Sequence, residues 1–143
     1  MEINSSTFVS DPQLVKLLRE QASSISCGHD QILFNEGQTP AGLYILHNGL
    51  VTLSRGREFN IALHTTACSL LDLPSLICGE RHVFTAIARS GATLSFVHRD
   101  SFHTLLRADP TLHARVLQIL AAEVEFTRQA ILQQYGWNAE YAA

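Results

Sequence analysis

The feature that most constrains the fold is the stretch from Ile32 to Leu53, where three short apolar runs are separated by two turn signals. The runs are Ile32–Phe34, Leu43–Leu46 and Leu50–Leu53. The first separating segment, Glu36–Gly42, has the composition of a long turn. The second, His47–Gly49, contains an Asn-Gly pair, which is typical of a two-residue hairpin because it accepts positive φ at low cost. Strands this short and closely spaced predict an antiparallel sandwich or barrel rather than a βαβ unit.

The rest of the chain predicts helices on both sides of this β region. Asp11-Pro12 is a helix start, since Asp is a favoured N-cap and Pro fits the first helical position, so we expect a leading helix over 11–22. A β-roll is expected over 24–98. Its later elements are a strand at Phe59–His64, a short helical turn at Leu70–Leu76, and strands at Val83–Ala88 and Thr93–Val97. From Asp100 onward the spacing of the apolar residues changes from a period of 2 to a period of about 3.6. This change predicts a short helix over 100–107 and a long helix over 110–134.

The expected fold class is therefore mainly β with flanking helices, in a single domain over 1–143. The arrangement is that of a double-stranded β-helix, a jelly-roll or cupin-like β-roll, with an N-terminal helix and a long C-terminal helix.

Composition argues against several classes of function. An apolar fraction of 46% and a charged fraction of 16% are typical of a globular domain. No apolar run approaches the roughly 20 residues of a membrane span, and no signal-like segment opens the chain, so a cytoplasmic location is expected. A net charge of −3 with scattered basic residues disfavours autonomous nucleic-acid binding. Cys27, Cys68 and Cys78 are expected to be reduced thiols.

The long helix carries an apolar stripe at steps of three or four residues. Its members are Leu112, Val116, Leu120, Val124, Thr127, Ile131 and Tyr135. Leu117, Ile119 and Phe126 widen this surface beyond what one small sheet can cover. One interpretation is an ordinary core helix. The other is that one flank packs on the roll and the other on a second copy, with Val116, Leu120, Val124, Thr127 and Ile131 forming the dimer helix.

A group of residues in the first half of the roll follows a known family pattern: Gly37, Pro40, Tyr44-Ile45-Leu46, Asn48-Gly49, Val51 and Leu53. At the exit into the helices the pattern continues with Val97, Arg99, Phe102 and Leu105. Together they resemble the cyclic-nucleotide-binding domain, the sensor module of the Crp–Fnr regulators. The resemblance implies that the long helix is a dimer coiled coil followed by a winged helix-turn-helix. Only nine residues follow Gln134, so we expect no DNA-reading domain and no direct specific DNA binding.

The resemblance also implies a ligand site. In nucleotide-binding members a Gly-Glu pair holds the ribose, and an Arg followed by a small residue and Ala meets the cyclic phosphate. Here Thr85-Ala86 matches the last two positions, and Phe84 stands where the Arg would be. The acid falls on Asp72, with Leu71 replacing the Gly, or in the other register on Leu73.

A buried phosphate must be paired by a fixed donor, so we expect cyclic nucleotides to bind weakly or not at all, unless Arg81 reaches the site. The sequence Leu-Pro-Ser-Leu followed by Gly79 is more similar to family members that sense something other than a cyclic nucleotide. The candidate pocket residues are Leu71, Asp72, Leu73, Pro74, Ser75, Arg81, Phe84, Thr85, Ala86 and Thr127.

Catalytic and metal motifs are not found. The seven histidines lack ligand spacing, and no Gly-x-Ser-x-Gly elbow occurs. Some members of the family bind haem, for which His82 or Cys78 could serve in principle, but no haem or metal is expected. The predicted function is a non-catalytic, ligand-sensing homodimer whose small-molecule ligand is unknown. The alternatives are an interaction subunit that forms heterodimers with full-length regulators and a small cupin-like enzyme.

Overall fold

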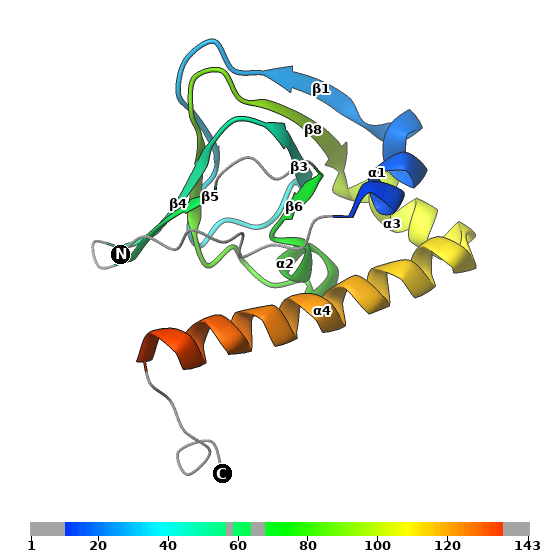
Figure 1. Cartoon of the computed structure of the whole chain (residues 1–143). Coiled ribbons are helices and arrows are strands. Elements are labelled where there is room, and N and C mark those ends of the chain that lie inside the picture. The colour runs from blue at the N-terminus through cyan, green and yellow to red at the C-terminus, as the bar shows by residue number, and fades with distance from the viewer. Residues whose placement is uncertain (1–10, 57–58, 64–67, 136–143) are drawn as a thin grey trace.

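Two antiparallel sheets curl around one interior and form an open roll with helices along one side (Figure 1). The structure, a computed structural model, describes residues 11–56, 59–63 and 68–135, and for 59–63 and 123–135 it describes the backbone. One sheet has the strand order β1 (Ser23–Ser26), β8 (Thr93–His98), β3 (Gly42–Asn48) and β6 (Ser69–Leu71). The other has the order β2 (Gln31–Phe34), β7 (Thr85–Ala88), β4 (Val51–Arg55) and β5 (Phe59–Leu63). The predicted fold class is confirmed.

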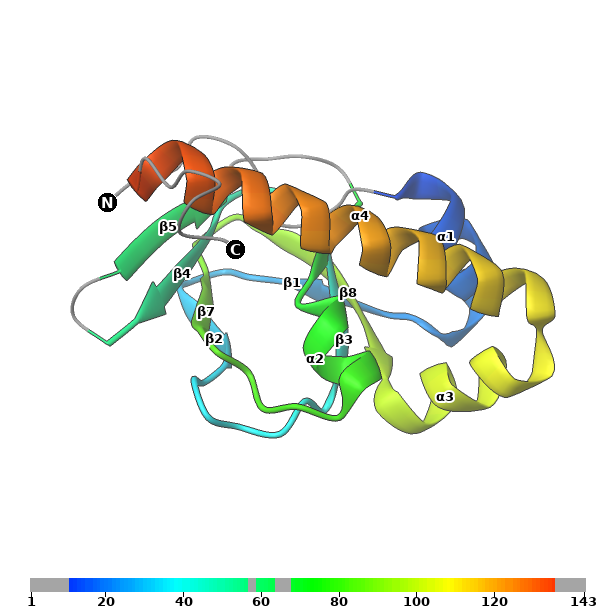
Figure 2. The ribbon, with the colours of Figure 1, turned by 90° about the horizontal axis from the view of Figure 1, so that it is seen from below.

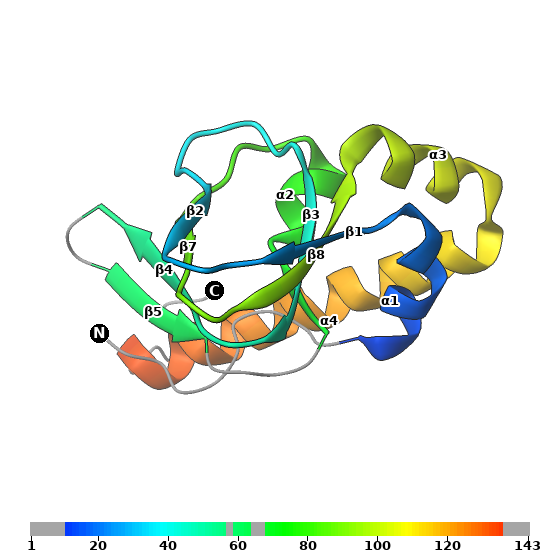
Figure 3. The same ribbon diagram turned by 90° about the horizontal axis from the view of Figure 1, so that it is seen from above.

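The helices are α1 (Pro12–Leu18) with a 3-10 turn at Arg19–Gln21, α2 (Leu73–Cys78), α3 (Arg99–Ala108) and α4 (Pro110–Tyr135). Asp11-Pro12 starts α1 for the predicted reason, and Asp109-Pro110 starts α4 in the same way. The Oδ1 of Asp11 accepts the Leu14 N–H at 2.8 Å, and the Oδ1 of Asp109 accepts the Thr111 N–H at 3.0 Å. Seen from above, α1, α3 and the first turns of α4 gather at one end of the roll (Figure 3).

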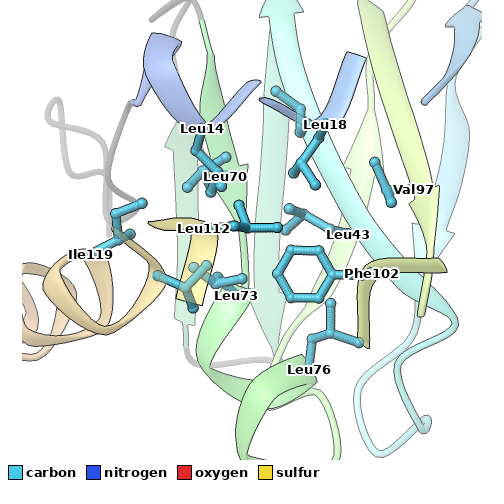
Figure 4. Packing of buried hydrophobic residues seen from close by; sticks show 12 residues of the cluster. Leu14, Leu18, Leu43, Leu70, Leu73, Leu76, Val97, Phe102, Leu112 and Ile119 are labelled. Atoms are coloured by element: carbon cyan, nitrogen blue, oxygen red, sulfur yellow. The ribbon is translucent and has the colours of Figure 1, made fainter. Parts of the chain in front are cut away.

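Strand β3 separates two apolar clusters because its side chains alternate between the two faces of its sheet. Tyr44 and Leu46 face the interior, whereas Leu43 and Ile45 face the helices. The interior cluster consists of Cys27, Leu33, Phe34, Leu46, Val51, Leu53, Leu71, Ala86, Ala88, Ala92 and Leu94. The helix-side cluster, shown in Figure 4, consists of Leu14, Leu18, Leu43, Ile45, Leu70, Leu73, Leu76, Val97, Phe102, Leu112, Val116 and Ile119.

Helix α4 crosses the helical side of the roll, passes α2 and continues toward the end of the molecule that holds β4 and β5 (Figures 1 and 2). Leu112, Val116 and Ile119 are buried in the helix-side cluster. Val116, which the sequence placed on the dimer helix, is thus a core contact within this chain. Leu120, also predicted for the dimer, is half-buried against the same cluster.

The predicted hairpin at Asn48-Gly49 is wrong. Strand β3 pairs with β6 and β8, whereas β4 pairs with β5 and β7, so this turn carries the chain from one sheet to the other. Gly49 has φ +104°, and a Cβ there would lie 2.6 Å from Ala92 Cα. The glycine is therefore required by a positive φ and by a close approach of two turns, not by a hairpin.

The segment expected as one helical turn over Leu70–Leu76 is also divided differently. Leu71 ends β6, Asp72 precedes α2, and α2 runs on to Cys78. Strand β7 begins at Thr85, two residues later than predicted. His64, the expected end of β5, lies outside the described residues.

Candidate ligand-binding site

The candidate site lies inside the roll, where the N-terminus of α2 meets the segment that leads into β7. Asp72 is the N-cap of α2 and has a left-handed backbone, with φ 58° and ψ 46°, but its side chain makes no cap hydrogen bond. Its Oδ2 lies 2.8 Å from the Nδ1 of His82, with 7% and 3% of the two side chains exposed. Such a buried carboxylate needs a hydrogen-bonding partner, and His82 supplies it.

Aromatic rings line the same region. The His82 ring stacks on Phe34, with ring centroids 3.7 Å apart and an interplanar angle of 16°. Tyr44 packs beside Phe34 at 6.2 Å and beside Phe96 at 4.7 Å. Burial raises the pKa of the Tyr44 phenol above its ordinary value.

Phe84, at the position where the resemblance places the phosphate-binding Arg, packs against the interior cluster that contains Leu71 and Ala86. Among residues whose burial the structure describes, no Lys or Arg side chain is buried. The two that are half-buried, Arg89 and Arg115, contact Asp30 and Asp11. The described interior therefore offers aromatic faces, one carboxyl group and the His82 imidazole, but no Lys or Arg side chain.

The remaining predicted residues do not all lie at this site. Leu73 belongs to the helix-side cluster, so of the two candidate acid positions Asp72 is the one on the interior side. Arg81 is exposed, and its Nη1 donates to the Gly37 carbonyl at 3.2 Å. Thr85 Oγ1 accepts the Glu36 N–H at 2.9 Å.

Two further residues lie in α2: Ser75 is buried and Pro74 is half-buried. The side chain of Thr127, like those of Val124 and Ile131, is outside the described residues.

Two residues that shape the site were not identified from the sequence in this role. His82 was considered only as a haem ligand, and Phe34 only as a strand residue. The sequence shows only that Asp72 and His82 lie ten residues apart among apolar residues. This spacing does not predict that the chain between them, which contains α2, brings the two side chains into contact. Within the described part of the chain, no group of three or more His, Cys, Asp or Glu side chains is arranged to hold a metal ion.

The family follows from the sequence and agrees with this fold. The sequence model of one protein family, the cyclic nucleotide-binding domain, matches residues 25–109 of this chain. The chain therefore belongs to this family. No curated protein sequence matches significantly. The family match confirms the resemblance predicted from the sequence.

The described residues contain no helix with the length and apolar character of a membrane span.

Several solved structures share the fold. The Thermus thermophilus catabolite activator protein is 23% identical with a TM-score of 0.64, over 86% of this chain and 58% of that one. The N-terminal domain of a Streptomyces coelicolor A3(2) transcriptional regulator is 22% identical with a TM-score of 0.63, over 84% and 88% of the two chains. The sensor domain of the Pseudomonas aeruginosa transcriptional regulator DNR is 16% identical with a TM-score of 0.60, over 81% and 78%. This chain therefore spans little more than half of the Thermus protein, and identities this low demonstrate the fold alone.

Proposed function

We propose that this chain is a non-catalytic regulatory module of the Crp–Fnr sensor type whose interior does not bind cyclic nucleotides in the usual way. The observation that carries the proposal is Phe84, which packs against the apolar interior at the position matched to the phosphate-binding Arg. The neighbouring acid, Asp72, is already bonded to His82. A cyclic phosphate would enter a region that presents an acidic side chain and no described buried Lys or Arg.

Cyclic AMP and cyclic GMP are expected to bind with dissociation constants in the millimolar range or weaker. An unpaired buried charge costs at least several kcal/mol, and losing that from a micromolar site, worth about −8 kcal/mol, leaves at most millimolar affinity. Calorimetric titration of the unmodified chain with each nucleotide measures this directly.

The matched variant is Phe84→Arg combined with Leu71→Gly and Asp72→Glu, which rebuilds the donor, the Gly and the longer acid. A gain of binding by this variant would support the proposed reason. A low-micromolar constant for the unmodified chain would refute the proposal.

We further propose that the module acts as a dimer through the outward face of α4. Leu112, Val116 and Ile119 face the core, which leaves Leu117 as a large apolar residue with 55% of its surface exposed. Ala114 and Ala121, three residues before and four after Leu117, are exposed on the same helix face. In the sequence, Val124 and Ile131 follow Leu117 by seven and fourteen residues, the heptad spacing of a coiled-coil seam.

Replacing Leu117 with Glu is expected to convert a dimer into a folded monomer, because two Glu side chains would face each other across the seam. Sedimentation equilibrium at tens of micromolar should give twice the chain mass for the unmodified protein and one chain mass for the variant. Leu17→Glu is the control, since Leu17 is 41% exposed on α1 and lies off the proposed seam.

A monomeric unmodified protein at these concentrations would contradict the homodimer. Pairing seen only with a full-length family member would favour the interaction subunit instead.

A further inference from the structure

The His82 side chain contacts Asp72 and Phe34 in the way that a bound ligand would, rather than as an ordinary core residue. The three side chains come from three separate segments: the start of α2, the segment between α2 and β7, and the end of β2. The Phe34 ring stacks on one face of the His82 imidazole, with ring centroids 3.7 Å apart. At the edge of the imidazole, Nδ1 lies 2.8 Å from the Oδ2 of Asp72. A flat ring is therefore recognised by stacking on its face and by a carboxylate at its edge.

The backbone of His82 is held from the other side. Its N–H donates to the Gln38 carbonyl at 2.9 Å, and its own carbonyl accepts the Gly37 N–H at 2.7 Å. The flanking residues Arg81 and Val83 are exposed, whereas His82 is buried. The segment is thus tied to the 35–38 turn at the surface and sends one side chain inward.

The position of Asp72 in this contact costs backbone strain and a helix-capping hydrogen bond. A non-glycine residue with φ 58° is uncommon and strained. Asp at an N-cap ordinarily stabilises its helix by accepting a backbone N–H. Here that bond is absent and the carboxylate is directed to the imidazole instead. The local structure gives up helix capping in favour of ring recognition.

We propose that Asp72 and Phe34 form a recognition site for a flat nitrogen heterocycle that donates an N–H, and that His82 is its built-in occupant. The inference rests on the proposed function, because it concerns the same interior from which phosphate is excluded. The ligand class is a neutral or cationic N–H heterocycle without a phosphate. The unmodified chain is then a module whose recognition site is filled by its own side chain.

The test is to remove the occupant and supply it as a free molecule. His82→Ala is made in the full chain, and free imidazole is titrated at pH 8.5, where it is neutral, while thermal unfolding is followed by circular dichroism. Saturating imidazole should raise the melting temperature of His82→Ala by roughly 3–6 °C and leave the unmodified protein unchanged. If His82→Ala is unfolded alone, imidazole should restore the native spectrum.

Two controls separate recognition from a general solvent effect. 1-Methylimidazole is neutral at this pH and has no N–H to donate, so it should give less than half the shift. Adding Asp72→Gly to His82→Ala removes the acceptor while tolerating the left-handed backbone, and it should abolish the shift.

Equal shifts for imidazole and 1-methylimidazole, or for the unmodified protein, would overturn the proposal. It would also be overturned if saturating imidazole did not stabilise His82→Ala. Nucleotide titration of the unmodified chain is a separate measurement. Failure of rescue without nucleotide binding rejects this inference alone, whereas tight nucleotide binding rejects the proposed function.

Discussion

Arg115→Met is expected to lower the free energy of unfolding by about 3 kcal/mol, at the lower end of the cost of leaving a buried charge without its partner. The Nη2 of Arg115 lies 2.6 Å from the Oδ2 of Asp11, whose side chain is only 4% exposed. Without the guanidinium, that carboxylate would stay buried without its cation. The Arg115 Nε is itself buried with no hydrogen-bond partner among the described residues, and Met removes that unfavourable group, which limits the loss.

Asp11→Asn breaks the same ion pair but is expected to cost only about 1 kcal/mol. Asn is as good an N-cap as Asp, so α1 keeps its start. The Arg115 side chain is 36% exposed and can turn toward water. Urea unfolding of both variants and of the double variant measures the asymmetry, and the double variant should be more stable than Arg115→Met alone. Equal losses in the two single variants would show that burial of the Asp11 carboxylate does not control this contact.

Local chemistry made the starts of α1 and α4 predictable. Asp11-Pro12 and Asp109-Pro110 carry the whole signal for a helix start within four residues, and the structure uses both of them. The second role of Asp11 could not be read in the same way. Its partner Arg115 lies 104 positions further along the chain (115 − 11), and only the packing of α1 against α4 brings the two together.

Strand pairing was harder to predict because it depends on partners distant in sequence. Asn48-Gly49 has the local chemistry of a hairpin, yet β3 and β4 belong to different sheets. Strand β6 is only three residues long, and Leu70 and Leu71 are buried on opposite faces, one in each cluster. A strand buried on both faces reads as a continuous apolar run, which periodicity alone does not separate from a helical turn.

For the candidate site, the family pattern could select individual positions but not the contacts between them. Phe84 and Asp72 were identified from that pattern, and both contact the interior. The His82 contact depends on an irregular segment whose path is set by backbone hydrogen bonds to the 35–38 turn. Those bonds involve no side-chain type that a sequence pattern could report.

Phe102→Ala is expected to cost about 3–5 kcal/mol of unfolding free energy, the usual range for removing a fully buried ring. Phe102 has no exposed surface, and Figure 4 shows its ring beside Leu43 of β3 and Leu76 of α2. The ring therefore joins α3 to the sheet and to α2, the helix whose N-cap is Asp72. Few neighbours can close the resulting cavity, because the leucines around it are already buried in the same cluster.

Two control variants make this loss interpretable in the same urea titration. Phe102→Leu keeps an apolar side chain in place and should lose markedly less than Phe102→Ala, since a smaller cavity remains. Leu17→Ala, on the exposed side of α1, should stay within about 0.5 kcal/mol of the unmodified protein. The transition should remain a single one, because the same sheet borders both clusters and neither can unfold alone. A loss below about 1 kcal/mol for Phe102→Ala, or a second transition, would show that the helices are only loosely attached to the roll.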